Sequence, residues 1–283
     1  MLVSLELIAF AVAIVSGFLH AVWNAIAQRS SDPSGAMVAQ LAFAGLGAAV
    51  ACVILGWPDA SVWHWMLIGS TANAAAILLL AAGYKRGDYA VTYGISRATA
   101  PWVLMPLTVF VGGAAFSPWG VAGVAAISVG VFLAATRGAL RSNETRNASG
   151  FAIASGLCMA FSVFSDANGA RAAGALQYGV AQTALNAVVG CLLFTVQQRR
   201  SVFLAMQRTW RIGIGSAVIS TLSYLLILWV FTQLPAVVGA ALRDSSMLFA
   251  LLIGTVWFRE RLQRWQWFGC AVFISGVLML RAA

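Results

Sequence analysis

Ten long apolar runs follow one another along this sequence. Each holds about 20 mostly apolar residues, the length that an α-helix needs to cross the roughly 30 Å hydrocarbon core of a bilayer. The runs cover residues 5–27, 35–56, 62–83, 89–113, 118–136, 150–170, 175–196, 211–233, 235–257 and 265–281. The connections between them are too short to hold an extramembrane domain. The sequence therefore predicts an all-α integral membrane protein with ten transmembrane helices.

The composition agrees with lipid as the main solvent of the chain. Only 9% of the residues are charged and 61% are apolar, whereas soluble proteins carry about 25% charged residues. The net charge of +9 does not indicate a nucleic-acid partner, because the basic residues stand singly in short loops. All four cysteines lie inside apolar runs, and none forms a pair or a Cys/His cluster with metal-ligand spacing. We therefore expect no metal and no cofactor.

Lysine and arginine are distributed unequally between the two sides of the predicted bundle. Of the 17 basic residues, 13 lie in the loops that follow odd-numbered runs, 2 lie on the other side, and Arg97 and Arg243 fall inside runs. Cytoplasmic loops carry an excess of Lys and Arg. We therefore expect the odd loops in the cytoplasm and both termini outside, in the periplasm, with the chain integral to the cytoplasmic (inner) membrane of a bacterium.

The two halves of the chain resemble each other. When the sequence is shifted by 146 residues, Arg97 meets Arg243, Trp119 meets Trp265, and two glycine pairs coincide, Gly123 with Gly269 and Gly130 with Gly276. Earlier in each half a shift of 142 fits better, and it places Asn24 on Asp166. The sequence therefore predicts two five-helix repeats, residues 1–137 and 148–283.

An odd number of helices in each repeat has a consequence for topology. The second copy must enter the bilayer upside down relative to the first. Inverted repeats recur in secondary transporters, where the substrate binds near the midplane at the repeat interface. The repeat therefore favours a transporter over other classes of membrane protein.

Several short segments also resemble a known family. They read SGFLHAVWN at 16–24, YKRGD at 84–88, ISRATAP at 95–101, DANGAR at 166–171, ALRDSS at 241–246 and RER at 259–261. Together they are similar to the EamA-type transporters of the drug/metabolite transporter superfamily, over nearly the whole chain. The resemblance implies ten helices, inverted repeats, and the export or import of small metabolites. One departure is that Glu260, a position with a common family glutamate, has Ala114 as its repeat equivalent.

Two arginines are expected near the middle of the membrane. Arg97 stands nine residues past Asp88, and Arg243 stands eight past Pro235, which places them about 14 and 12 Å into their helices. A charge at that depth costs at least about 2.5–3.5 kcal/mol. Either guanidinium could grip a carboxylate or phosphate with two hydrogen bonds. Alternatively, either could be structural, bonded to an acid or to backbone carbonyls.

Polar residues on neighbouring positions complete the candidate substrate site. Tyr89 and Tyr93 share a helix face with Arg97, so we expect Arg97 to contact the substrate. Arg243, with Ser246 nearby, is expected to hold its helix through a protein partner such as Asp166. Small residues every four positions from Ser246 also suit close helix packing.

The first run carries a further polar face, formed by His20, Trp23 and Asn24. His20 could carry a coupled proton because its reference pKa is near 6.5, although a packing role is the alternative. Asp166, an acid inside a predicted span, is the second proton-coupling candidate, and its alternative role is to pair with an arginine.

These observations predict a secondary transporter for a small metabolite with an anionic group, such as an amino acid or an organic acid, working by alternating access with export favoured. An intramembrane enzyme is a second class, but His20 and His64 lie on different runs, and the sequence has no HExxH, GxSxG or nucleotide-binding motif. A passive channel or scramblase is a third. The expected partners are a small solute and the lipid bilayer, and a homodimer is compatible with the sequence.

Overall fold

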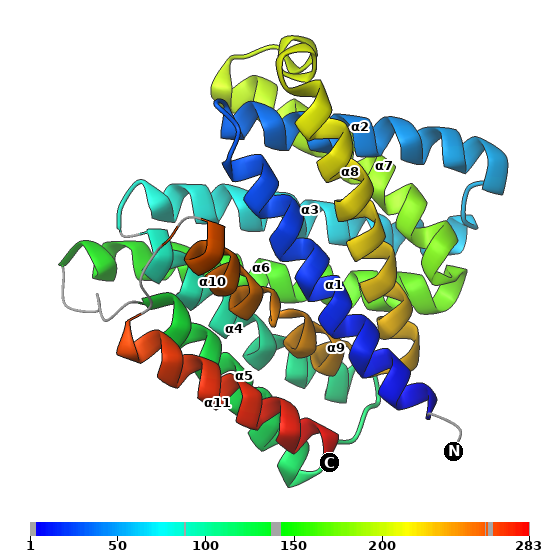
Figure 1. Cartoon of the computed structure of the whole chain (residues 1–283). Helices are drawn as coiled ribbons and strands as arrows, with labels where there is room; N and C mark the ends of the chain where they lie inside the picture. Colours follow the sequence, from blue (N-terminus) through cyan, green and yellow to red (C-terminus); the bar gives the residue numbers. More distant parts are fainter. Residues whose placement is uncertain (1–3, 88, 137–142, 258, 260–262, 283) are drawn as a thin grey trace.

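The computed structural model describes residues 4–87, 89–136, 143–257, 259 and 263–282. The described chain is helical (Figure 1). Its elements are α1 (Leu5–Gln28), α2 (Pro33–Leu55), the short 3-10 helix η1 (Ala60–Val62), α3 (Trp63–Tyr84), α4 (Tyr89–Phe110), α5 (Pro118–Thr136), α6 (Asn143–Ala173), α7 (Ala175–Gln198), α8 (Val202–Gln233), α9 (Ala236–Arg243), α10 (Ser246–Trp257) and α11 (Arg264–Arg281). Asp88 and Glu260 lie outside the described residues.

The helices follow the predicted runs with three differences. Helix α6 begins at Asn143, earlier than expected. Helix α8 also begins early, at Val202, and has a kink at Thr209. The ninth run is divided into α9 and α10 by a turn at Asp244 and Ser245, where the predicted single helix is therefore wrong.

Eight helical stretches are long and apolar enough to cross a membrane, and α9 with α10 counts as one of them. The chain is thus an integral membrane protein with multiple helical spans. The other two predicted spans correspond to α4 and α11, which are less apolar: α4 contains Arg97 and two prolines, and α11 is bounded by Arg264 and Arg281. That these two helices also cross the membrane stays a prediction.

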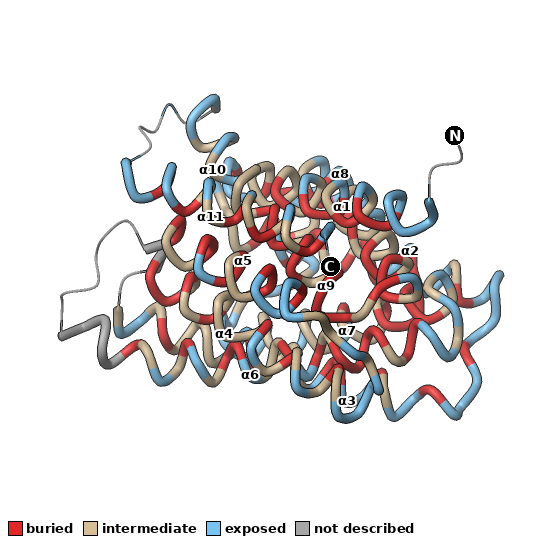
Figure 2. The backbone as a smooth tube through the Cα atoms, turned by 90° about the horizontal axis from the view of Figure 1, so that it is seen from below, coloured by how far each residue is buried: buried red, intermediate tan, exposed pale blue. Residues whose placement is uncertain are grey.

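Buried and exposed residues alternate along the helices, so that each helix turns part of its surface to the inside of the bundle (Figure 2). Many of the exposed residues are large and apolar. Phe110 is 85% exposed and Val53 is 82% exposed, whereas buried positions are rich in alanine. Such a distribution suits a bundle surrounded by lipid, because small residues at helix interfaces let backbones approach closely. Trp102 faces outward, 53% exposed, whereas Trp229 packs against the core.

Helices α5 and α11 pack closely along each other, through the glycines that the 146-residue shift aligns. A Cβ added to Gly123 would lie 2.9 Å from the carbonyl oxygen of Gly276, and one added to Gly130 would lie 2.8 Å from that of Gly269. The reverse additions meet the same partners, at 2.7 Å from Gly123 O and 2.8 Å from Gly130 O. Any side chain at these positions would push the two helices apart.

The remaining helices surround a central space. Helix α3 packs along α6, and α8 packs along both α1 and α2. Ser16 and Ser223 join α1 to α8, each hydroxyl donating to the other's backbone carbonyl at 2.8 Å. The start of α1 and the end of α11 lie on the same side of the bundle (Figure 1), as an even number of spans requires. The division at residues 1–137 and 148–283 stays a prediction.

Candidate functional site

A polar cavity of about 350 Å³ lies at the centre of the bundle. Eight helices contribute to its wall: α1, α2, α3, α4, α6, α7, α8 and α9. Each helix contributes only a few of the polar side chains, so no single stretch of the sequence identifies the cavity. Its charged lining residues are Arg97, Asp166, Arg243 and Asp244.

Arg97 is already paired on its side of the cavity. Its Nε donates to the Tyr93 hydroxyl at 3.0 Å, and its Nη1 lies 3.4 Å from Asp244 Oδ1. The guanidinium also lies 5.3 Å from the centre of the Tyr93 ring, within reach of a cation–π interaction. Tyr93 is one helical turn before Arg97, so α4 itself supplies two of these contacts. The Arg97 charge is therefore balanced by the protein.

Arg243, at the end of α9, is bound differently. Its Nη2 lies 3.3 Å from His20 Nδ1, and its Nε is buried without a hydrogen-bond partner. Among the described residues, Arg243 makes no ion pair. Its pairing with Asp166, which the sequence suggested, is not present. Arg243 thus brings a charge into the cavity that no neighbouring carboxylate contacts.

His20 has a defined protonation state in this arrangement. Trp23 Nε1 donates to His20 Nδ1 at 3.3 Å, and Arg243 approaches the same nitrogen. Arginine and tryptophan side chains only donate, so Nδ1 must be the unprotonated nitrogen. The imidazole is therefore neutral, with its proton on Nε2, and it positions Arg243 instead of adding a charge.

Asp166 occupies another part of the wall, on α6. Tyr178 donates its hydroxyl to Asp166 Oδ1 at 3.2 Å. Tyr224 interacts with the same carboxylate, but its buried hydroxyl makes no aligned hydrogen bond. Asp166 makes no ion pair with the described residues. Its carboxylate is therefore held by neutral hydroxyls.

The turn between α9 and α10 positions two of the four charged residues of the cavity, Arg243 and Asp244. The Asp244 and Ser245 amides donate to carbonyls three residues back, Ala241 and Leu242, at 3.2 and 3.1 Å. This tightening ends α9 at Arg243. Gly17 of α1 packs on the turn, since a Cβ there would lie 2.9 Å from the Arg243 carbonyl oxygen. Broken helices at the midplane are a recurrent feature of transporter binding sites.

The structure brings together only some of the predicted site residues. His20, Trp23, Arg97, Asp166 and Arg243 all line the cavity. Asn24 does not line it, and its amide donates to the His20 carbonyl at 2.8 Å. Tyr93 does not line the cavity itself, but its hydroxyl accepts a hydrogen bond from Arg97, which does. Ser246 is buried at the start of α10, away from the lining. The side chain of Tyr89 lies outside the described residues.

Other lining residues were not expected from the sequence. The polar ones are Asp244, Tyr224, Gln40, Asn73, Ser162, Thr183, Asn186, Ser220 and Thr221. Their signal is weak because polar residues scattered along an apolar run do not show which of them face a common cavity. Only Asp244 could have been found, as an acid inside a predicted span.

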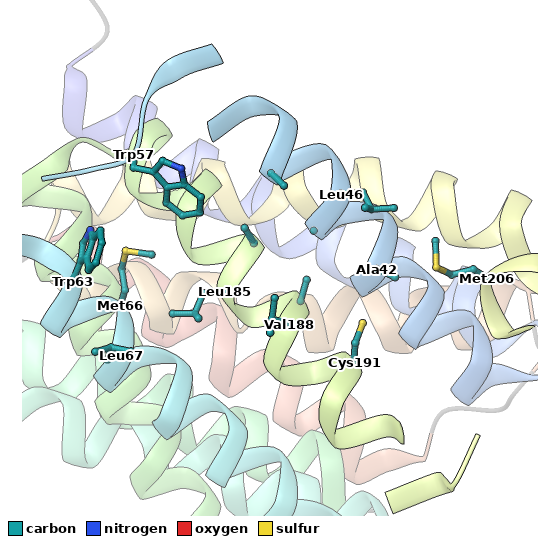
Figure 3. A pocket seen from close by; sticks show the side chains of 14 residues that line it. Ala42, Leu46, Trp57, Trp63, Met66, Leu67, Leu185, Val188, Cys191 and Met206 are labelled. Carbon is teal, nitrogen blue, oxygen red and sulfur yellow. The ribbon is translucent and has the colours of Figure 1, made fainter. Parts of the chain in front are cut away.

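A second hollow, larger and apolar, lies on the outer flank (Figure 3). Its volume is about 890 Å³, and its walls come from α2, α3, α7 and α8 with the chain after α2. Trp57 and Trp63 lie toward one end and Met206 toward the other, with Leu46 and Val188 between them. Helix α7 turns Val188 to this groove and Asn186 to the central cavity. The groove contains no charged side chain, so the cavity is the place for an ionic solute.

Neither hollow contains a cluster suited to metal binding. The described residues include no group of three or more His, Cys, Asp or Glu side chains that could hold a metal ion.

Comparison with known proteins identifies the family. Residues 147–282 match the EamA-like transporter family. The second half of the chain is an EamA-family transporter domain. This confirms the resemblance seen in the sequence, and proteins of this family are generally transporters and not enzymes.

The likeness in fold extends over almost the whole chain. A crystal structure of another protein aligns with 97% of this chain and with 95% of its own, at a TM-score of 0.70 and 15% sequence identity. None of the curated proteins compared with the chain matches it. At this low identity the structural likeness establishes the fold alone.

Proposed function

We propose that this transporter carries a small metabolite with an anionic group, such as an organic acid or an amino acid, by alternating access across the cytoplasmic membrane. Export is the favoured direction, driven by accumulation of the solute inside. Both termini lie outside, as the loop charges indicate. The binding site is the central cavity, with Arg243 as the anchor for the anionic group.

The observation that carries this proposal is the state of Arg243. Its guanidinium lines the cavity, its Nε has no partner, and no described carboxylate pairs with it. A buried charge without a partner is costly. A carboxylate entering the cavity can accept two parallel hydrogen bonds from a guanidinium, so binding would relieve that cost.

Alternating access gains support from the packing of α5 on α11. Under the 146-residue shift, the contact of Gly123 with Gly276 is transformed into the contact of Gly269 with Gly130, and both contacts exist. A two-fold axis between the helices produces this reciprocity, because residue i then contacts j while the equivalents of i and j also touch. The reciprocity supports an inverted pair of repeats, which can exchange conformations about that axis.

Contacts between the halves at opposite ends of the bundle provide two closures. At one end, Arg200 binds both carboxylate oxygens of Asp32, with Nη1 at 3.1 Å from Oδ1. At the other end, the Gln177 amide donates to the carbonyls of Gly56 and Trp57 at 3.5 and 3.3 Å. The 142-residue shift relates these two places. Opening one end while the other stays closed would expose the cavity to each side in turn.

The test uses the purified transporter in liposomes loaded with unlabelled solute. A panel of radiolabelled organic acids and amino acids is added outside, with and without a pH gradient, and counterflow is measured. A carrier gives saturable counterflow of at least one anionic solute. A channel or scramblase gives flux without counterflow, an enzyme returns a chemically altered solute, and either result rejects the proposal. Arg243→Gln, which removes the charge, should abolish counterflow of that solute.

A further inference from the structure

The charges in the central cavity are balanced in a way that involves Asp166. Arg97 and Asp244 form an ion pair at 3.4 Å, and His20 is neutral because its Nδ1 accepts hydrogen bonds. Arg243 and Asp166 are left, with opposite charges and no ion pair to each other. With Asp166 ionised, the charges that line the cavity sum to zero, but Arg243 and Asp166 are held apart on different helices.

Binding of an anion changes this balance. If a carboxylate pairs with Arg243, the positive charge that offset Asp166 is neutralised by the solute. Asp166 is then an uncompensated carboxylate in a buried site, which is an expensive state. A proton on Asp166 restores neutrality, because the site then contains the solute anion paired with Arg243 and a neutral carboxylic acid.

The surroundings of Asp166 suit a neutral acid as well as a carboxylate. The titratable and charged groups that face it are Tyr178 from α7, Tyr224 from α8 and Arg243 from α9. Helix α3 passes it at Gly69, where a Cβ would lie 3.3 Å from Asp166 Oδ1. Tyr178 donates to Oδ1, and the Tyr224 hydroxyl lies against the same carboxylate without an aligned hydrogen bond. Because a hydroxyl also accepts hydrogen bonds, Tyr224 can receive the O–H of a protonated Asp166.

We propose that Asp166 takes up one proton whenever an anion binds at Arg243, so that the transporter moves one proton with each monovalent anion. The proton comes from water on the side to which the cavity is open, and it returns to water on the other side when the anion leaves. This coupling rests on the proposed function. It makes transport electroneutral, so that a solute that accumulates inside leaves together with a proton.

The experiment compares net uptake with exchange in liposomes, using whichever of lactate, pyruvate and benzoate gives counterflow with the wild type. The wild type should accumulate the probe when the outside is made acidic. A potassium diffusion potential of either sign should change the initial rate by less than about twofold. Asp166→Asn cannot ionise, and it should keep counterflow but lose accumulation driven by the pH gradient. Asp59→Asn, the same change at an exposed helix cap outside the cavity, should behave like the wild type.

Each negative result would overturn a different part of the proposal. Accumulation by Asp166→Asn under the pH gradient overturns the role of Asp166. Uptake driven by the membrane potential and not by pH overturns electroneutral coupling. If the wild type shows no counterflow of any panel anion, the proposed function falls, and this inference falls with it.

A second measurement does not depend on how the variant folds. Wild-type protein in weakly buffered detergent solution should take up about one proton for each probe anion that it binds, as reported by a pH-sensitive dye. Binding without proton uptake overturns the coupling.

Discussion

Arg97 and Arg243 align when the sequence is shifted by 146 residues, yet their surroundings in the protein differ. Arg97 has a carboxylate, a hydroxyl and an aromatic ring around its guanidinium, whereas Arg243 has one imidazole nitrogen and an unpartnered Nε. The difference arises because α4 continues past Arg97, while α9 ends at Arg243 and the turn that follows brings Asp244 to Arg97. Two residues that align in the sequence can thus differ in their surroundings, with one guanidinium paired by the protein and the other without a carboxylate partner among the described residues.

The largest expected effect is a loss of stability when the ion pair between Arg97 and Asp244 is broken. Arg97→Ala leaves Asp244 buried without its partner, and removing one member of a buried pair costs about 3–5 kcal/mol. We expect a marked fall in Tm in detergent for Arg97→Ala and a much smaller one for Arg243→Ala. Adding Asp244→Asn to Arg97→Ala should recover much of the loss. Equal falls in the two single variants would remove the distinction between the arginines.

This expectation reverses the one drawn from sequence. The pattern around Arg97, with Tyr93 one turn earlier, suggested a ligand site, and the small residues near Arg243 suggested packing. Both local observations were sound, and α4 does place Tyr93 against Arg97. What the sequence could not supply was the partner from another helix, because Asp244 lies 147 residues away from Arg97.

The fold was more accessible to prediction than the site. Runs of about 20 apolar residues predict membrane helices because lipid leaves the backbone few alternatives. The break at Asp244 and Ser245 escaped because neither residue is a glycine or proline, the usual signals of a helix end. The polar lining could not be predicted, because residues such as Asn73 and Asn186 lie on different helices. Only the packing of the bundle brings them to one cavity.

A smaller effect should come from the imidazole that positions Arg243. Replacing His20 by Ala removes a hydrogen-bond acceptor for a charged group, worth about 1.5–3 kcal/mol, and allows the guanidinium to move. The apparent KM for the anion should rise about tenfold or more, and Tm should fall by less than it does in Arg97→Ala. His20→Gln can still offer an oxygen acceptor and should recover part of the loss. A Gln variant no better than Ala would show that the imidazole acts in another way.

The smallest effect should come from the closure at Asp32 and Arg200, far from both arginines of the cavity. Arg200 holds the pKa of Asp32 well below its ordinary value, chiefly through its hydrogen bonds. A lowered folded-state pKa means that the pair stabilises this closed end at neutral pH and is lost only as the pH falls far into the acid range.

Exposed ion pairs contribute only about 0.2–1 kcal/mol, so Asp32→Asn should raise the open population at that end by about fivefold at most. Cysteine at Ser220, which lines the cavity, can report this through its rate of labelling in a background without native cysteines. Arg200→Gln should give the same rate, and the double variant should add nothing further. Additive effects would mean that the two residues do not act as one closure.

The central claim is that Arg243, and not Arg97, grips the anionic group of the solute. The direct measurement is the dissociation constant of the transported anion for Arg243→Lys and Arg97→Lys, by calorimetry in detergent. Lysine keeps the charge but loses the planar fork. The account predicts at least about tenfold weaker binding for Arg243→Lys, equivalent to about 1.4 kcal/mol, and a change of less than about threefold for Arg97→Lys. Wild-type affinity in Arg243→Lys together with lost binding in Arg97→Lys would contradict it.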